Sequence, residues 1–221
     1  SGTPRFEDAL IGMLRSPNLA SGEAKARHYD HEVKGLTVVK PFVGVKEDVP
    51  SDAAVFLIEH GSTEGFVLSE GINPFYSELD TRWMTASVID EAVRRAVGTG
   101  ARLDRMAGLD NYCWPDPIVS ETNPDGEHKL AQLVRSTQAL SEFCRAYGVP
   151  CISGKDSMKN DSTMGGVRIS IPPTLLFSVI ARIDDVRRAV TMDVKTSGAR
   201  VYVLGVTRDE LGGSEYFRWR G

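Results

Sequence analysis

The stretch NPDGEHKLAQLVRSTQALSEFCRAYGVPCISGKDS, residues 123 to 157, decides the fold class of this chain. A long helix is predicted to begin at Asn123-Pro124, because apolar side chains recur at helical spacing as far as Tyr147. Gly148 and Pro150 end that helix. The apolar run 149–152 that follows is a predicted strand leading into a turn, SGKDS. A long helix followed directly by a strand indicates that helices and strands form separate layers.

The rest of the chain supplies a second long helix and several further strands. That helix begins at Asp80 or Thr81 and stops at Gly98 and Gly100. The pattern does not have the continuous rhythm of a doubly wound parallel sheet, so it predicts an α+β fold: a mixed β-sheet with two long helices on one face. Strands are expected at residues 55–58, 66–68, 175–183 and 201–206, and a further strand is expected to end near Leu109.

Two strand ends carry polar groups that suit a ligand. In SGKDS, free backbone N–H groups beside a cation and hydroxyls suit an anionic oxygen such as a phosphate. The spacing is not that of a P-loop, and for this segment taken alone a solvated turn is the more common explanation. Asp110-Asn111 follows the strand that ends near Leu109. It could contact the amine or hydroxyl groups of a nucleotide, or form an Asx-turn.

These two segments resemble the second half of the phosphoribosylformylglycinamidine synthase family, within the aminoimidazole ribonucleotide synthetase superfamily. Further family-like segments occur in the expected order along nearly the whole chain, and they are SPNLAS (16–21), YDHEVKGLTVVKP (29–41), DAAV (52–55), NPFY (73–76) and LGGSEY (211–216). The resemblance implies a synthetase N-terminal-like domain whose sheet forms half of a pseudo-dimeric barrel.

The resemblance also implies roles for four residues. Asp110 and Gly154 match positions that contact ATP, and Ser157 matches one that contacts formylglycinamide ribonucleotide. Lys155 stands where the small-subunit type of the enzyme carries an Asn that helps to hold magnesium. A lysine cannot ligate a cation, so Lys155 either neutralises phosphate or is a solvated turn lysine. ATP and Mg²⁺ are the cofactors implied.

A second magnesium site, in this half of the enzyme, is expected to be degraded. Family members place an acidic residue just before the Asn-Pro turn, and an Asn four positions after a helix Glu. This chain has Gly71 at the first position and Glu91 followed by Arg95 at the second. Glu91 is the one candidate ligand that remains, and Arg95 on the same helix face favours a salt bridge instead.

The expected organisation is a linker with an N-terminal helix (1–48), one synthetase-like domain (49–195), and the start of a truncated C-terminal domain (196–221). Excision would expose an apolar strand face, with residues 55–58 or 175–180 as candidates for pairing between molecules. No catalytic residue is expected in this chain, because the family's catalytic His belongs to an SEHC-like motif that is absent here. His31 is interpreted as structural.

Composition excludes several classes of protein. The chain has 221 residues and a formal net charge of -4, which argues against a surface that tracks nucleic acid. No apolar run reaches the ~20 residues of a membrane span, so no membrane association is expected and a cytoplasmic location is predicted. The three cysteines have no metal-ligand spacing and are expected to be reduced and mostly buried, and the histidines predict no zinc site.

The leading hypothesis is a fragment of an ATP-dependent ligase that amidates formylglycinamide ribonucleotide with glutamine-derived ammonia. The fragment is expected to be inactive alone, with the first half of the enzyme and a glutaminase domain or subunit as partners. The alternatives are another ATP-using member of the superfamily, and a structural half that binds no nucleotide.

Overall fold

The structure is a computed structural model, and it describes residues 2, 4–28 and 31–221. Tyr29 and Asp30, which open the family-like segment YDHEV, lie outside the described residues. The chain divides into two compact units, one formed by Glu32–Asp193 and the other by Ser1–His31 with Val194–Gly221. The larger unit contains the sheet, both long helices and both polar segments singled out by the sequence.

The larger unit is built on a mixed six-stranded sheet. In spatial order its strands are β1 (Thr37–Val39), β4 (Ala54–Leu57), β5 (Gly65–Ile72), β10 (Thr174–Ile183), β6 (Met106–Cys113) and β7 (Cys151–Ser157). Neighbouring strands are antiparallel except β6 and β7, which are parallel. The predicted α+β class with a mixed sheet is therefore confirmed.

Smaller elements connect these strands. Two short hairpins pair β2 (Phe42–Val43) with β3 (Val49–Pro50), and β8 (Ser162–Met164) with β9 (Val167–Ile169). Single 3₁₀ turns form η1 (Val33–Gly35), η2 (Pro74–Glu78), η3 (Leu103–Arg105) and η4 (Val186–Arg188).

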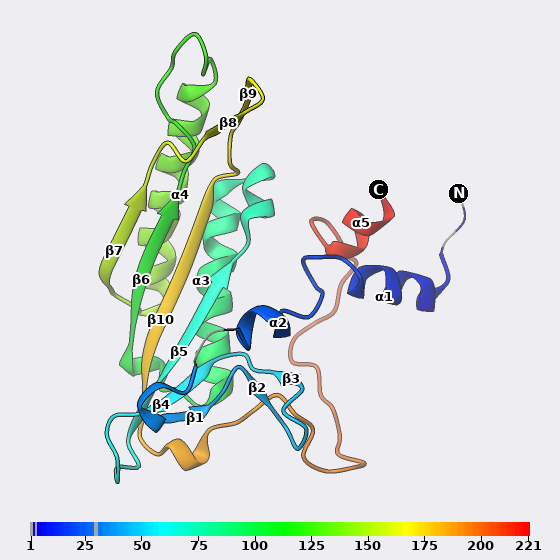
Figure 1. Ribbon diagram of the computed structural model, residues 1–221, viewed down its shortest axis with the longest axis vertical. Helices are drawn as coiled ribbons and strands as arrows, with labels where there is room; N and C mark the ends of the chain where they lie inside the picture. Colours follow the sequence, from blue (N-terminus) through cyan, green and yellow to red (C-terminus); the bar gives the residue numbers. More distant parts are fainter. Residues whose placement is uncertain (1, 3, 29–30) are drawn as a thin grey trace. The chain divides into compact units, whose positions relative to one another are not determined.

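Two long helices lie together on one face of the sheet (Figure 1). Helix α3 (Thr81–Thr99) begins where the sequence predicts, because the Asp80 side chain accepts a hydrogen bond of 2.7 Å from the backbone N–H of Arg82. Left-handed Gly100 ends it. Helix α4 (Gly126–Tyr147) begins slightly after the predicted Asn123 and ends at left-handed Gly148. A helix between β6 and β7 is what a parallel connection requires.

The core lies between the sheet and α3. Alternate residues of β5 and β10 are buried, among them Val67, Phe177 and Val179, and they meet Met84 and Val88 of α3, which are fully buried. This period of two in the strands and the apolar face of the helix together exclude water from one side of the sheet.

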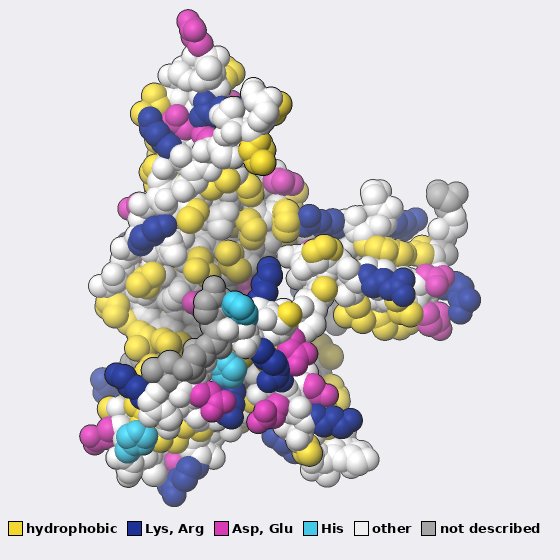
Figure 2. Space-filling view, viewed as in Figure 1, with side chains coloured by type: hydrophobic (Ala, Val, Ile, Leu, Met, Phe, Trp, Pro, Cys, Tyr) yellow, Lys and Arg dark blue, Asp and Glu magenta, His cyan; other side chains and the backbone are white. Residues whose placement is uncertain are grey.

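The opposite side of the sheet is open in this unit. Side chains that alternate with the core residues reach solvent there, including Leu68 (39% exposed), Ile72 (52%) and Ile180 (41%). Figure 2 shows hydrophobic side chains gathered over β5, β10 and β6 on this face. An apolar surface of this kind marks a place where another protein surface is expected.

Three sequence predictions need correction. Residues 55–58 and 175–180 were candidates for edge pairing, but β4 and β10 are interior strands, and the edges of the sheet are β1 and β7. The predicted strand at residues 201–206 does not form, because no described strand lies beside it to complete its backbone hydrogen bonds. Cys151 is exposed rather than buried.

The smaller unit consists of short helices. These are α1 (Phe6–Leu14), α2 (Glu23–Ala26) and α5 (Glu215–Arg220). Helix α5 packs closely on α1, because a Cβ atom at Gly12 would collide with the indole ring of Trp219. Among the described residues, none of the helices combines the length and apolarity needed to cross a bilayer.

Candidate functional site

The polar segments of β6 and β7 lie side by side. The parallel pairing places Asp110 opposite Gly154 and Asn111 opposite Lys155, and it places Cys113 opposite Ser157. The strands run several residues past Leu109 and Ile152, where sequence reasoning ended them. The polar residues therefore belong to the ladder itself, because β6 is hydrogen-bonded on both sides regardless of side-chain polarity.

Asp110 lies against the backbone of Gly154. A Cβ atom at position 154 would be 2.8 Å from Oδ1 and 3.0 Å from Oδ2 of Asp110, so only glycine leaves this space for the carboxylate. Burial raises the pKa of Asp110, and the nearby Asp156 adds to this, while the backbone N–H of Asp110 opposes it. The pair is thus a close contact between a carboxylate and an exposed edge strand.

The side chains of the predicted ligand residues, and that of Asn111, divide between the two faces of the sheet. Tyr112 contacts Ser136 of α4 with its hydroxyl, at 3.1 Å, so residues in phase with it, including Asp110, point to the helix side. Asn111, Lys155 and Ser157 are out of phase and belong to the open side. A ligand on the open face would lie on the same side of the sheet as the last three side chains.

Two features of the open side suit a polar ligand. The Oδ1 atom of Asn111 is buried and has no hydrogen-bond partner among the described residues, so it is an available acceptor. Lys155 is exposed, and its Nζ lies 3.8 Å from Sγ of Cys113. An acceptor without a partner next to an exposed cation is what a nucleotide with N–H groups and phosphates would use.

Ser157 is the last residue of β7, and its hydroxyl is hydrogen-bonded within the chain. Its Oγ donates to Oδ1 of Asn160 at 2.9 Å, and Nδ2 of Asn160 donates to the carbonyl of Ser157 at 2.7 Å. To contact a substrate, the hydroxyl would have to exchange Asn160 for the new acceptor.

The candidate metal position is filled by an ion pair. Glu91 binds Arg95 at 2.9 Å, and Arg95 also donates to the carbonyl of Glu70 at 3.0 Å. A Cβ atom at Gly71 would collide with the backbone oxygen of Val88, so α3 packs too closely on β5 for an acidic side chain there. Within the described ranges, no three His, Cys, Asp or Glu residues are grouped to hold a metal ion.

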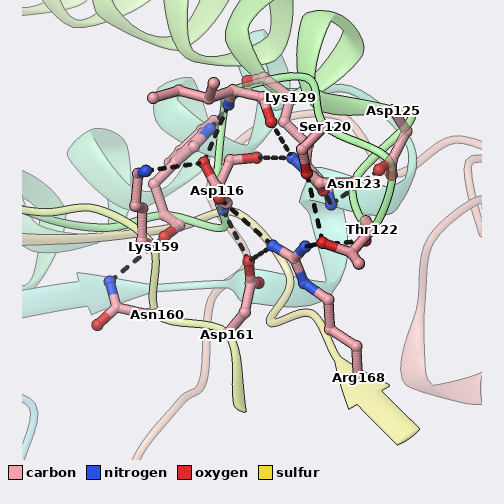
Figure 3. A network of polar contacts seen from close by, with 12 residues as sticks. Asp116, Ser120, Thr122, Asn123, Asp125, Lys129, Lys159, Asn160, Asp161 and Arg168 are labelled. Atoms are coloured by element: carbon pink, nitrogen blue, oxygen red, sulfur yellow. Dashed lines mark hydrogen bonds and ion pairs between the residues drawn. The ribbon is translucent and has the colours of Figure 1, made fainter. Parts of the chain in front are cut away.

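Sequence reasoning missed a polar network beyond the end of β6 (Figure 3). Oδ2 of Asp161 accepts from the Arg168 guanidinium at 2.6 Å and from the backbone N–H of Asp116 at 3.1 Å. Burial acts to raise the pKa of Asp161, but these hydrogen bonds outweigh it and hold the pKa below its usual range. No spacing could reveal the network, because Asp116 and Arg168 are 52 positions apart.

The same network fixes the loop that leads into α4. Nδ2 of Asn123 donates to the carbonyls of Asp116 (2.8 Å) and Ile118 (2.6 Å), while Nζ of Lys129 donates to Oδ1 of Asn123 (2.7 Å). Lys129 also binds Asp125 at 3.0 Å. The WPDP loop (residues 114–117) is therefore held in place by these polar contacts.

A polar pocket of about 470 Å³ adjoins this network. Its charged lining consists of Asp116, Asp161, Lys159 and Arg168. These charges pair with one another across the pocket, so it carries no surplus charge for an anion or a cation.

Comparison with known proteins identifies the relatives of the chain. No family model matches it. The PurL subunit of phosphoribosylformylglycinamidine synthase from Thermoplasma acidophilum is 34% identical over 196 residues, which are 88% of this chain and 24% of the relative. The same subunit from Alkaliphilus metalliredigens is 35% identical over 211 residues, 96% of this chain and 26% of the relative.

This chain is homologous to one segment of PurL. It spans about a quarter of the length of the curated PurL relatives that it matches. PurLQS from Thermotoga maritima has a TM-score of 0.57 at 28% identity, covering 79% of this chain and 25% of that one. T. maritima PurL complexed with FGAR has a TM-score of 0.55 at 28% identity, covering 77% and 24%. The resemblance seen in the sequence is thereby confirmed.

Proposed function

We propose that this chain is part of an ATP-dependent carbon–nitrogen ligase, which converts formylglycinamide ribonucleotide to the amidine with glutamine-derived ammonia in purine biosynthesis. The observation that carries the proposal is the similarity to PurL. Individual PurL relatives match 88% to 97% of the chain. Thermotoga maritima PurL complexed with AMPPCP and with FGAR supports ATP and this ribonucleotide as ligands.

The residues of β6 and β7 fit an ATP-linked role on the open face. ATP, when bound, supplies the phosphoryl group that activates the amide oxygen of the substrate. We assign to Lys155 the neutralisation of phosphate charge, and to Asn111 the acceptance of a ligand N–H by its unpartnered Oδ1. Ser157 would donate to the ribonucleotide. Such fixed contacts lower the barrier by alignment and charge stabilisation.

The role of Asp110 and Gly154 is indirect in this proposal. Asp110 points to the helix side, where it fills the space above Gly154. We propose that the pair keeps the start of the SGKDS strand flat and leaves its backbone N–H groups open to ATP. Asp110 would thus act on ATP through the conformation of β7.

We propose that Mg²⁺, if it accompanies ATP, is held by residues outside this chain. The residues around Glu91 do not fit the ion, because Arg95 neutralises the one carboxylate and Gly71 leaves no room for a second. No step is assigned to a metal here. A cytoplasmic location stays a prediction.

The open sheet face supports the proposed partners. Its apolar side chains and the uncovered edge strand β7 fit the first half of the same enzyme, which would complete a pseudo-dimeric barrel. The glutaminase domain or subunit would supply ammonia to that assembly. We propose that this chain alone makes no amidine product from ATP, ammonia and the ribonucleotide.

Kinetics on the full-length parent protein test the proposal. Ser157→Ala should raise the KM for the ribonucleotide several-fold, because one hydrogen bond of about 0.5–1.5 kcal/mol is lost. Asp110→Asn should act chiefly on the KM for ATP. Ser141→Ala, at an exposed position on α4, is the matched control and should change neither KM. Unchanged kinetics in both Ser157→Ala and Asp110→Asn would contradict the assigned site.

A structural half that binds no nucleotide is the second candidate. It is favoured by the Glu91–Arg95 ion pair and by the close packing at Gly71. Calorimetry of the chain with ATP and Mg²⁺ separates the two, because the first proposal requires ATP to bind β7 at least weakly. If neither the chain nor the full-length parent protein gives a heat of binding with ATP and Mg²⁺, the structural half that binds no nucleotide is favoured.

A further inference from the structure

The end of α4 and the start of β7 bring two thiols together. Sγ of Cys144, on the last turns of α4, lies 3.7 Å from Sγ of Cys151, the first residue of β7. The two residues are seven positions apart in the sequence. Neither belongs to the ligand positions assigned above, so the function does not explain their contact.

Backbone hydrogen bonds hold both cysteines in place. The N–H of Val149 donates to the carbonyl of Cys144 at 2.9 Å, which closes the helix around left-handed Gly148. The carbonyl of Pro150 accepts from Gly108 of β6 at 2.8 Å, and Cys151 pairs with Gly108 in the sheet. The thiols therefore meet because of the architecture, not because of a loose loop.

Access to the pair comes from one side. Cys144 is buried, whereas Cys151 is exposed. Both line a largely apolar groove of about 570 Å³, together with Leu140, Pro150 and the exposed Arg145 at its rim. A small molecule can reach Cys151 through this groove, and Cys144 is then the nearest thiol behind it.

We propose that Cys144 and Cys151 form a redox-active dithiol that is oxidised to a disulfide by a low-molecular-weight disulfide. The Cys151 thiolate attacks the reagent, forms a mixed disulfide and releases one thiolate. The Cys144 thiolate then attacks Sγ of Cys151, breaks the mixed bond and releases the second thiolate. The two cysteines lose two electrons and two protons, and the reagent is reduced to two thiols.

The geometry permits the bond. A disulfide needs the sulfur atoms about 2.05 Å apart, so they must approach by about 1.6 Å. The product would tie the first residue of the edge strand β7 covalently to α4.

Thiol acidity predicts how fast the reaction is. Burial raises the pKa of Cys144 to about 12, with further contributions from Cys151 and from the Asp110 carboxylate of β6. Burial also raises the pKa of Cys151, and Asp110 adds to this, although the hydrogen bond with Cys144 opposes it. Because the thiolate is the nucleophile, oxidation should be slow at neutral pH and faster as pH rises.

The third cysteine is an internal control. Cys113 pairs with Ser157, out of phase with Tyr112, and its Sγ lies near Nζ of Lys155 on the open side of the sheet. It cannot reach Cys144 or Cys151 without unfolding of β6. Any bond that includes Cys113 would therefore report a different structure.

Peptide mapping of the folded 221-residue chain tests the proposal. The chain is equilibrated with oxidised and reduced glutathione at several ratios, blocked with N-ethylmaleimide, digested without reduction and analysed by mass spectrometry. The expected product is a peptide pair joined through Cys144 and Cys151, which increases with the oxidised fraction. Cys113→Ser should keep this product. Cys144→Ser should instead leave Cys151 as a glutathione adduct.

Three results would overturn the proposal. These are an adduct on Cys151 without the cross-link in the wild-type chain, cross-links to Cys113 of equal abundance, or free thiols at both positions in fully oxidising buffer. Circular dichroism before blocking checks that the chain is folded. If Cys144→Ser does not fold, the wild-type map alone decides the question.

Discussion

Position 154 requires glycine because the carboxylate of Asp110 already lies where a larger side chain would be. The Oδ atoms of Asp110 are 2.8 and 3.0 Å from the position of a Cβ atom there. At the scale of single residues, the glycine of the SGKDS segment is therefore explained first by the contact between β6 and β7. Any ligand role is added to this packing requirement.

Replacement of Gly154 tests the contact. Gly154→Ala should lower the free energy of unfolding by about 0.5–1.5 kcal/mol, because Asp110 must leave its preferred rotamer. The cost should largely vanish in an Asp110→Ala background, which a double-mutant cycle by urea denaturation measures. Equal costs in both backgrounds would show that Asp110 is not the obstacle.

Two aspartates should give opposite pH dependences. The pKa of Asp110 in the folded chain is raised by burial. Its contribution to the free energy of unfolding is therefore fully present below the pKa of the unfolded chain, about 3.9, and is lost as pH rises through the folded pKa. Asp110→Asn should then stabilise the chain at neutral pH and have little effect in acid.

Asp161 should behave in the reverse way, because its contacts with Arg168 and the backbone hold its pKa low. The contribution of Asp161 to the free energy of unfolding is present above the pKa of the unfolded chain, and it is lost as pH falls through the pKa of the folded chain. Asp161→Asn should destabilise at neutral pH, with a difference from wild type that narrows in acid. Urea unfolding of the wild type and both variants, from neutral pH to pH ~3, measures how the free-energy difference of each variant from the wild type changes with pH. The same direction of change in both variants would contradict this assignment.

At the scale of elements, α3 packs closely on β5 at the place where the family resemblance implied metal ligands. Gly71 has no room for a side chain because the backbone of Val88 lies against it. Arg95, four residues after Glu91, joins that carboxylate to the carbonyl of Glu70 and so fastens the helix to the strand. An ion pair and a close helix–strand contact thus occupy the positions where the family resemblance implied metal ligands.

Gly71→Ala should be strongly destabilising. A methyl group there must push the α3 backbone away, and overpacking of this kind costs about 1–3 kcal/mol or more. Gly98→Ala is the matched control on α3, because a Cβ atom there meets nothing within 4 Å, and it should be neutral or slightly stabilising. Urea denaturation compares the two. A mild effect of Gly71→Ala would mean that α3 can move and that an acidic residue could be accommodated.

At the scale of the whole molecule, the larger unit has one covered and one open sheet face. The helices bury the first, and the second presents Leu68, Ile72 and Ile180 to solvent. A sheet of this composition is expected to find a partner surface, which in the proposed enzyme is the first half. When the first half is absent, a second copy of the chain can cover the open face in its place.

Self-association through this face is therefore expected for the isolated chain. Ile180→Lys should reduce it, because a charge at the centre of the apolar face opposes burial. Val97→Lys changes an equally exposed residue on α3 (45% exposed) and should leave association unchanged. Sedimentation velocity over a range of concentrations gives the result. A wild-type chain that stays monomeric at high concentration would contradict the expected role of the face.

The sequence alone determined the α+β class, the limits of α3 and the family. Helical spacing, the Asp80 cap and the terminal glycines are local signals, so they could be interpreted without coordinates. Only the tertiary structure decided where β6 and β7 end, which strands form the edges, and on which face each ligand candidate lies. The Asp116–Asp161–Arg168 network and the Cys144–Cys151 contact also needed coordinates, because the fold joins residues that no spacing in the sequence relates. Strand pairing and side-chain contact across the fold are non-local, and this is the physical reason for the division.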